Sequence, residues 1–306
     1  MSRARSLARK AVLGLVLGVL LYTAIVFWIG LDSTVAAVRS IEWWVLPAAC
    51  GLSFANYALR FLKWERYRAL LGVAMPRATS WRIYLAGFSM GVTPGKLGEV
   101  LKAWLIRRVN GAPIHRTAPM VVAERFTDLL GYLLLIAAGG IATYPEYQLV
   151  FWSTIALCAF AVALAGSRRF AWVVSRIVAN TPYFWRVAGK VEGSFESVRV
   201  LLSPRELIGP TLLSSVSWGC ECLAFWLIAN AIAETEVSLR FAVFAYAFSA
   251  VAGAVLIVFP GGLVVTEGLL GTLLRREIQG AALGDAAREL ARAQAGPAVI
   301  LVRLCT

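Results

Sequence analysis

The stretch that decides the fold class is residues 11–30, AVLGLVLGVLLYTAIVFWIG, in which twenty successive positions carry no charge. An α-helix needs about 20 apolar residues to cross a hydrocarbon core of ~30 Å. Hydrophobic residues make up 59% of the 306 positions and the mean hydropathy is +0.73, whereas soluble domains contain roughly 45–50% apolar residues. The sequence therefore predicts an integral membrane protein.

Further apolar windows follow along the chain. Three of them carry no charge and two carry an interruption: residues 43–59, 129–145, 149–167, 207–231 (interrupted by Glu221) and 241–266 (interrupted by Pro260-Gly261-Gly262). They predict an all-α polytopic membrane protein with about six spanning helices. The first window is not expected to be a cleaved secretory signal, because it is too long and more spans come after it.

The formal net charge of +13 is concentrated in links between the apolar windows. Links 31–42 and 144–147 hold one cation between them, while the alternate links hold three basic clusters. These clusters are Arg60, Lys63, Arg66, Arg68, Arg77 and Arg82; Arg107, Arg108 and Arg116; and Arg168, Arg169, Arg176, Arg186, Lys190, Arg199 and Arg205. Such alternation is a topology signal. It predicts a bacterial inner (plasma) membrane protein with a cytoplasmic N-terminus, and no nucleic acid partner.

The cysteines and the single histidine give little support for a metal or redox site. Cys50, Cys158, Cys220, Cys222 and Cys305 are odd in number and lie in or beside apolar windows, so we expect buried thiols and no disulfide framework. His115 lies among link residues. We therefore predict no metal site and no cofactor, and Cys220-Glu221-Cys222 lacks enough ligands to change that.

The longest polar link, residues 167–206, contains a helical pattern over about 182–202. Apolar residues recur every three or four positions with charged residues opposite them. We predict a cytoplasmic interfacial helix here, between a first half (about 11–166) and a second half (about 207–306) of a single transmembrane domain. A plain linker between the halves fits the same position.

Two segments have the pattern of broken, re-entrant helices. Residues 81–92 are apolar but too few to cross, and they lead into TPGKLGE (93–99) before residues 100–106 resume the helix. Residues 241–259 lead into PGGLVVTEG (260–268) and then 269–274. The turns are predicted at Pro94, Gly95, Gly98, Pro260, Gly261 and Gly262. Paired interruptions suggest an inverted repeat, with ordinary helix kinks as the alternative.

Charged residues coincide with these interruptions. Lys96, Glu99 and Lys102 recur every three residues after the first turn, and the next span opens with Glu124, Arg125 and Asp128. Because an ionisable residue in a span costs at least ~2.5–3.5 kcal/mol, such residues are normally paired or face water. Three cations and three anions predict a neutral network lining a headgroup cavity, with Glu267 as the counterpart in the second half. An ion-pair cluster that only holds helices together is the alternative.

These motifs carry a resemblance to a known family. The segments 93–99 with Lys102, 124–128, 260–262 and 266–268 resemble the lysylphosphatidylglycerol synthase transmembrane family, the flippase-like membrane region of the multiple peptide resistance factor. The resemblance runs from about residue 11 to the end of the chain. It implies two re-entrant hairpins that face each other, with Lys96, Glu99, Glu124, Arg125, Asp128 and Glu267 as cavity residues.

The resemblance also implies a partner. Family members are similar to flippases of modified phospholipids, and stand-alone members occur beside glycosyltransferase and hopanoid genes, so a phospholipid or a polyprenyl- or hopanoid-type lipid and a lipid-modifying enzyme are the expected partners. The soluble aminoacyltransferase domain of the full synthase is absent from the sequence given. The last apolar run, 296–302, is short of a span, although Arg303 is similar to an arginine of the family's last helix, so we expect a truncated last helix.

Three functions remain open at this stage. The first is a lipid flippase or lipid-transport subunit, and the absence of a Walker-type phosphate-binding motif argues against ATP hydrolysis by these residues. The second is a membrane-embedded glycosyl or aminoacyl transferase that uses Glu99, Glu124 or Asp128 as a base. The third is a non-catalytic partner of a lipid-synthesis complex.

Overall fold

The computed structural model describes residues 35, 38–39, 41–88, 97–181, 188–233, 236–255, 263–281 and 285–305, and every regular element in these ranges is a helix. The prediction of an all-α fold is thus confirmed. The first apolar window, the turn residues Pro94, Gly95 and Pro260-Gly261-Gly262, and Lys96 lie outside the described residues.

Three described helices are long and apolar enough to cross a bilayer: α3 (Val45–Leu70), α8 (Pro145–Gly166) and α11 (Pro204–Ile232). α8 and α11 lie close to their predicted windows, but α3 continues eleven residues beyond the predicted end at position 59. The prediction ended there because Arg60 and Lys63 were interpreted as link residues. The structure corrects this, since both side chains are buried within the helix bundle.

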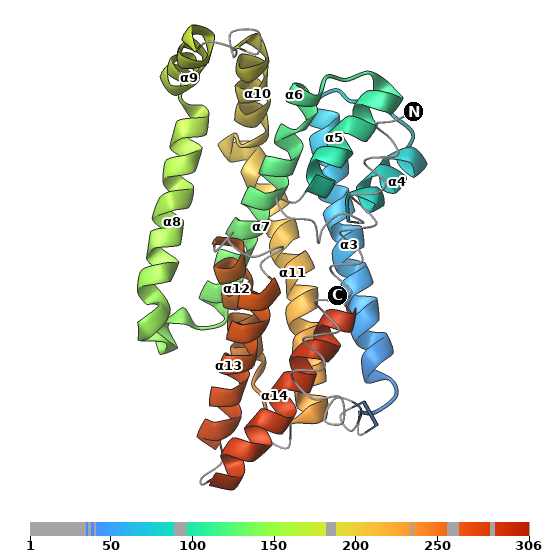
Figure 1. Ribbon diagram of the computed structural model, residues 1–306, viewed down its shortest axis with the longest axis vertical. Coiled ribbons are helices and arrows are strands. Elements are labelled where there is room, and N and C mark those ends of the chain that lie inside the picture. The colour runs from blue at the N-terminus through green and yellow to red at the C-terminus, as the bar shows by residue number, and fades with distance from the viewer. Residues whose placement is uncertain are drawn as a thin grey trace.

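The next helices, α4 (Arg77–Phe88) and α5 (Leu97–Asn110), form a hairpin beside α3 (Figure 1). At its outer end, the Asn110 amide donates to the Ala74 carbonyl at 2.6 Å. At its inner end, the Phe88 ring lies 5.0 Å from the Tyr57 ring in the middle of α3. The hairpin therefore enters beside α3 to about half its length and returns to the same end.

The short helix α6 (Ile114–Thr117) joins the hairpin to a second group of helices, α7 to α11. α7 (Pro119–Ala138) runs antiparallel to α5, and the short η1 (Ile141–Thr143) leads into α8. α8 ends at Gly166, and Ser167 caps the following helix α9 (Arg168–Asn180) by accepting a hydrogen bond from Phe170 N. α10 (Ala188–Leu201) then leads into α11, so the polar link holds two helices where the sequence pattern indicated one.

The last three helices are α12 (Leu239–Val255), α13 (Leu263–Ala281) and α14 (Asp285–Cys305). α12 and α13 pack against each other, and Arg276 near the end of α13 lies 3.4 Å from the hydroxyl of Tyr147 at the start of α8. Figure 1 shows α12 and α13 as neighbours, with α14 crossing in front of α11. The far end of α13 thus lies beside the α7–α8 link.

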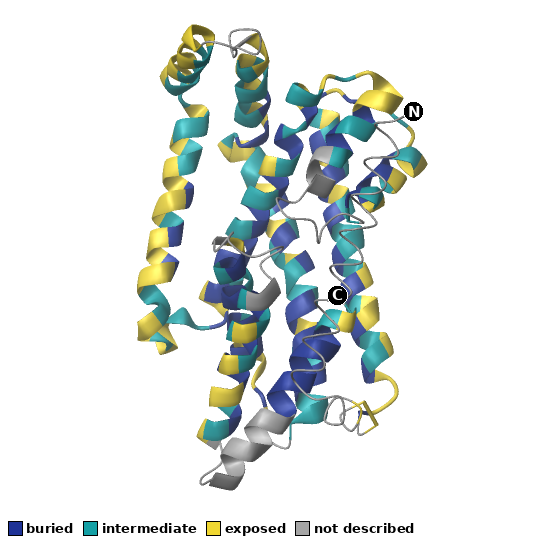
Figure 2. Cartoon of the chain, viewed as in Figure 1, coloured by how far each residue is buried: buried dark blue, intermediate teal, exposed yellow. Residues whose placement is uncertain are grey.

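Two apolar clusters fill the bundle, and Figure 2 shows the buried faces turned inward while α8 and α9 present many exposed positions. The larger cluster joins α7, α11, α12, α13 and α14, and includes Phe225 and Phe244. The smaller one packs the α4–α5 hairpin on α3 and α7 through Trp64, Tyr84 and Ile106. The hairpin is therefore part of the packed core.

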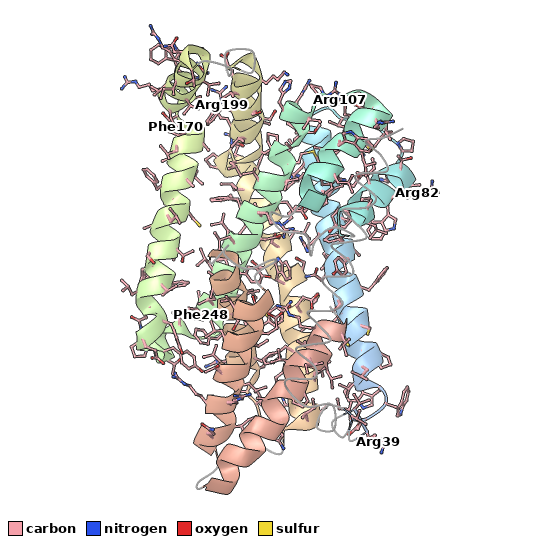
Figure 3. The ribbon with its side chains drawn as sticks, in the orientation of Figure 1. Arg39, Arg82, Arg107, Phe170, Arg199 and Phe248 are labelled. Carbon is pink, nitrogen blue, oxygen red and sulfur yellow. The ribbon has the colours of Figure 1, made fainter. Side chains whose placement is uncertain are left out.

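The two ends of the bundle differ in charge. We call the end that holds α6, α9 and α10 the basic end; Figure 3 shows Arg82, Arg107 and Arg199 toward it and Arg39 toward the opposite end. At the opposite end, the cations whose side chains are described are matched by an equal number of such carboxylates: Arg39, Arg240, Arg275 and Arg276 against Glu42, Glu146, Glu236 and Glu277. The basic end therefore carries most of the excess positive charge of the described links.

Candidate functional site

A polar stripe runs along one face of α3 and is the base of the candidate site. Its five members follow one another at intervals of three and four residues, and all are buried: Ser53, Asn56, Arg60, Lys63 and Tyr67. Intervals of three and four place side chains on one side of a helix. The stripe faces α7 and α11, and most of its polar atoms bond to these helices, whereas Asn56 Oδ1 and Arg60 Nε have no hydrogen-bond partner among the described residues.

The middle of the stripe forms ion pairs with two carboxylates of α7. Nη2 of Arg60 lies 3.1 Å from Oε1 of Glu124 and 3.3 Å from Oδ2 of Asp128. Nζ of Lys63 donates to Oδ1 of Asp128 at 2.5 Å and to the Ser214 hydroxyl of α11 at 2.7 Å. Glu124 and Asp128 are one helical turn apart, which lets one arginine contact both.

The α4–α5 hairpin contributes a third cation. Lys102 is 1% exposed, and its Nζ donates to Oε2 of Glu124 at 3.2 Å. The same ammonium group lies 5.1 Å from the ring centre of Trp64, 4.8 Å from Tyr84 and 5.0 Å from Phe88. Aromatic faces attract cations, most strongly where water is excluded. Lys102 therefore ties the hairpin to both α3 and α7.

The buried cluster of Arg60, Lys63, Lys102, Glu124 and Asp128 carries an excess of one positive charge over these described side chains. Arg125 adds another cation, because its Nη1 lies 3.9 Å from Oδ2 of Asp128. Buried ion pairs recover their desolvation cost only with good geometry and added hydrogen bonds. An unbalanced cation in such a cluster favours the binding of an anion beside it.

Two glycines allow the helices of this cluster to approach one another. A Cβ at Gly87 would overlap the Lys102 side chain, and a Cβ at Gly131 would lie 2.8 Å from the Cβ of Ser214. At Gly131, α7 and α11 are thus close enough for Ser214 to donate to Oδ1 of Asp128 at 3.0 Å. Apolar windows in the sequence give no sign of these close approaches.

Toward the opposite end, two further members of the stripe, Asn56 and Ser53, form hydrogen bonds with α11. The Asn56 amide donates to the Ser217 carbonyl at 2.8 Å, and the Ser53 hydroxyl donates to Oε2 of Glu221 at 3.2 Å. Glu221 is 2% exposed and therefore buried in the helix interface. The residue that interrupts a predicted span is thus part of the α3–α11 contact.

A cavity of about 560 Å³ opens beside the cluster, between α7 and the last four helices. This volume lies within the ~300–1,000 Å³ range of ligand pockets. Its lining combines two arginines, one carboxylate and several aromatic rings: Arg125, Asp128, Tyr132, Trp218, Tyr246, Thr266 and Arg303. Arg60 connects the cluster to the cavity, because its guanidinium lies 4.8 Å from the ring centre of Trp218.

Arg303 is held in the cavity wall by Glu267. Nε of Arg303 lies 2.8 Å from Oε1 of Glu267, as an ion pair between α14 and α13. The two groups are close enough for an ion pair but are not oriented for a hydrogen bond. Neither Glu267 oxygen accepts a hydrogen bond from a described residue. Glu267 therefore acts on the cavity through Arg303, and the remaining donors of the guanidinium are not occupied by this carboxylate.

Among the predicted site residues, the structure brings Lys102, Glu124, Arg125 and Asp128 together. Glu267 belongs to the separate Arg303 pair, Gly98 lies in the first turn of α5, and the Glu99 side chain lies outside the described atoms. Sequence reasoning missed Arg60, Lys63, Ser214 and Trp218. The signal that could have found the first two is the polar spacing that starts at Ser53.

Comparison with known proteins now identifies the family. A family model described as the lysylphosphatidylglycerol synthase TM region matches residues 15–306. The chain belongs to this family. The resemblance noted from the sequence motifs is thereby confirmed, and the chain is a membrane protein of the lysylphosphatidylglycerol synthase TM-region family.

Two similar proteins come from Methanothermobacter thermautotrophicus (strain ATCC 29096 / DSM 1053 / JCM 10044 / NBRC 100330 / Delta H), and both bear the name UPF0104 membrane protein. One is 24% identical over 268 residues, which covers 81% of this chain and 78% of the relative. The other is 22% identical over 285 residues, which covers 85% and 84%. The family relationship therefore extends over most of the transmembrane region.

The chemistry that the site offers is recognition of an oxyanion next to apolar groups. Guanidinium groups suit phosphate and carboxylate oxygens because their planar forks donate two parallel hydrogen bonds. Two of them, Arg125 and Arg303, reach the cavity from different helices. The aromatic lining adds single donors, the hydroxyls of Tyr132 and Tyr246 and the buried Trp218 indole N–H, and the last of these has no hydrogen-bond partner among the described residues.

Proposed function

We propose that this protein moves lipids with an anionic headgroup between the leaflets of the bacterial inner membrane. The observation that carries the proposal is the cavity between α7 and α14, with Arg125 and Arg303 in its wall, beside a cluster whose described side chains carry excess positive charge. The headgroup phosphate would bind between the two arginines. The acyl chains would stay in the bilayer.

The helical hairpins support this reading. α4–α5 and α12–α13 each return to the end from which they start, so we propose that both are re-entrant and meet near the middle of the membrane. Non-helical backbone at membrane depth is tolerated where it is buried in protein or lines a polar cavity. With the basic end in the cytoplasm, the predicted cytoplasmic N-terminus fits the same orientation.

The family supports the substrate class. Its name refers to the membrane region of a synthase whose product, lysylphosphatidylglycerol, is a phospholipid. We extend to this chain only the ability to bind a lipid phosphodiester, together with the expectation of a lipid-modifying enzyme as partner. Lipids of the polyprenyl-phosphate type present the same phosphate chemistry to Arg125 and Arg303.

The test is lipid translocation in proteoliposomes. Fluorescent phospholipids in the outer leaflet are bleached by a membrane-impermeant reductant, so protein-dependent flipping appears as a larger bleached fraction. We expect flipping by the unaltered protein and a loss of at least tenfold in rate in Arg125→Gln, since a charged hydrogen bond contributes ~1.5–3 kcal/mol. Arg107→Gln on the exposed face of α5 is the matched control and should flip as the unaltered protein does.

Two outcomes would overturn the proposal. One is that folded, reconstituted protein moves neither anionic phospholipids nor polyprenyl phosphates. The other is that Arg125→Gln and Arg107→Gln flip at the same rate. Arg125 is preferred over Arg303 for this test, because its side chain is 40% exposed and its loss disturbs packing less than that of a residue paired inside the bundle.

A further inference from the structure

Helix α9 has a surface that the lipid-transport proposal does not use. Its sequence, RRFAWVVSRIVAN, contains Arg168, Arg169 and Arg176 and no acidic residue. The helix follows the apolar spanning helix α8 after a single residue, Ser167. Since α8 has the length and composition of a bilayer span, α9 begins at the level where the membrane ends.

One side of α9 is already occupied by α10. The ring of Phe170 packs edge-on against that of Phe195 at 5.8 Å, and Arg168 lines a groove on the same side together with Glu192 and Glu196 of α10. Figure 3 shows Phe170 and Arg199 where these two helices meet. The inner side of α9 is therefore a protein contact, and it already contains carboxylates near Arg168.

The other side of α9 is exposed and combines apolar and basic groups. Val173 and Ile177 are 43% and 60% exposed, and Trp172, which is 57% exposed, lies at the border of this side because it also lines the groove with α10. Arg169 and Arg176 are exposed as well, and the guanidinium of Arg176 lies 4.8 Å from the Trp172 ring centre. At about 100° per residue, Val173 and Ile177 lie on one edge, with the two arginines between them and Trp172.

This arrangement matches the interface of a bilayer better than water or hydrocarbon. Interfacial helices bury an apolar edge at the boundary of the acyl chains and direct basic residues at lipid phosphates. Helix α9, all of which the structure describes, contains no carboxylate that could neutralise Arg169 and Arg176.

We infer that α9 is an anchor that docks on the anionic surface of the membrane beside the end of α8. Val173 and Ile177 enter the boundary of the acyl chains, while Arg169 and Arg176 bind headgroup phosphates. The partner is thus the bilayer surface itself, with anionic phospholipid as the preferred component. The inference needs only that α8 spans the membrane, so it stands or falls separately from lipid transport.

Depth measurements on the full chain test the anchor. Spin labels are attached to single cysteines, Ile177→Cys or Ala179→Cys, in a variant without the native cysteines, reconstituted in phosphatidylcholine vesicles with or without phosphatidylglycerol. Ala179 is exposed and lies about 200° around the helix from Ile177, which makes it the matched control. Accessibility to oxygen reports the bilayer, and accessibility to a charged nickel complex reports water.

We expect the label at position 177 to be oxygen-accessible and nickel-protected in vesicles that contain phosphatidylglycerol, and the label at 179 to be nickel-accessible. The double change Arg169→Gln and Arg176→Gln should lower the docked-to-undocked ratio roughly fivefold per arginine, because each basic residue near an anionic surface contributes ~1 kcal/mol. Arg107→Gln should leave it unchanged. Added salt should act in the same direction as the double change.

Equal nickel accessibility at positions 177 and 179 in both kinds of vesicle would overturn the anchor. Equal protection at 177 with and without phosphatidylglycerol, unaffected by the arginine changes, would overturn the anionic partner. Because the altered side chains are exposed, folding is checked simply by elution as a single species in size-exclusion chromatography.

Discussion

The Lys102 side chain of α5 passes over Gly87 of α4 with no room for a Cβ between them. This contact lets the ammonium group reach Glu124 on α7 while the three rings of Trp64, Tyr84 and Phe88 enclose it. The position of the α4–α5 hairpin is therefore linked to the charge cluster through one glycine and one lysine.

Replacement of this glycine should loosen the hairpin. We expect Gly87→Ala to lower the free energy of unfolding by ~1–3 kcal/mol, because the added methyl displaces a packed side chain. Thermal unfolding in detergent measures the change. Gly51→Ala on the exposed side of α3 is the control, since a Cβ there meets nothing within 4 Å and alanine is the better helix former. Equal melting temperatures for the two variants would contradict the close contact.

Asp128 should contribute more to stability than Glu206, a half-buried carboxylate that is paired with an exposed arginine. Asp128→Asn leaves Arg60 and Lys63 buried with one carboxylate fewer, and breaking a buried pair costs ~3–5 kcal/mol. Glu206→Gln removes the ion pair with the exposed Arg66, and such a surface pair contributes ~0–1 kcal/mol to the free energy of unfolding. Urea or thermal unfolding of both variants checks the difference. A smaller effect of Asp128→Asn would mean that the cluster is hydrated.

Variants of the Glu267–Arg303 pair should distinguish an effect on stability from an effect on lipid transport. Arg303→Glu alone places two carboxylates together and should destabilise the α13–α14 contact. The exchange Glu267→Arg with Arg303→Glu restores opposite charges and should recover much of the melting temperature. It also moves the cation out of the cavity wall, so lipid flipping should remain low. Recovery of flipping together with stability would assign Arg303 a purely structural role.

The ends of the helices should be accessible from two different sides of the membrane. In a background without native cysteines, Arg276→Cys and Glu146→Cys should react with an impermeant maleimide from one side, since Arg276 lies beside Tyr147. Arg107→Cys at the basic end should react from the other side. Labelling of positions 276 and 107 from the same side would rule out a re-entrant α12–α13 hairpin.

Much of the helical fold can be predicted from the sequence, because long charge-free runs leave few alternatives in a membrane. The windows 149–167 and 207–231 come close to α8 and α11 for this reason. α3 shows the limit of the method. A window that ends at the first charge stops at position 59, although Arg60 and Lys63 remain helical and are buried against α7.

Only part of the charge cluster could be predicted from the sequence: the α7 carboxylates could, whereas their partners on α3 and α11 could not. Glu124 and Asp128 are carboxylates at the start of an apolar run, so the cost of their burial marks them in the sequence. Their partners on α3 and Ser214 on α11 depend on which faces meet, and that is set by packing between helices distant in the chain. Gly131, where α7 and α11 cross, has no local signal at all.

The polar stripe of α3 also limits how the protein can move. Its side chains are bonded to α7 and α11 at several levels along the helix, from Ser53 to Tyr67. A turn of α3 by one residue, about 100°, would point Arg60 and Lys63 toward hydrocarbon at a cost of ~2.5–3.5 kcal/mol each. α3 therefore cannot rotate about its own axis without breaking these contacts. Any opening and closing of the cavity must come from movement of the helices around α3.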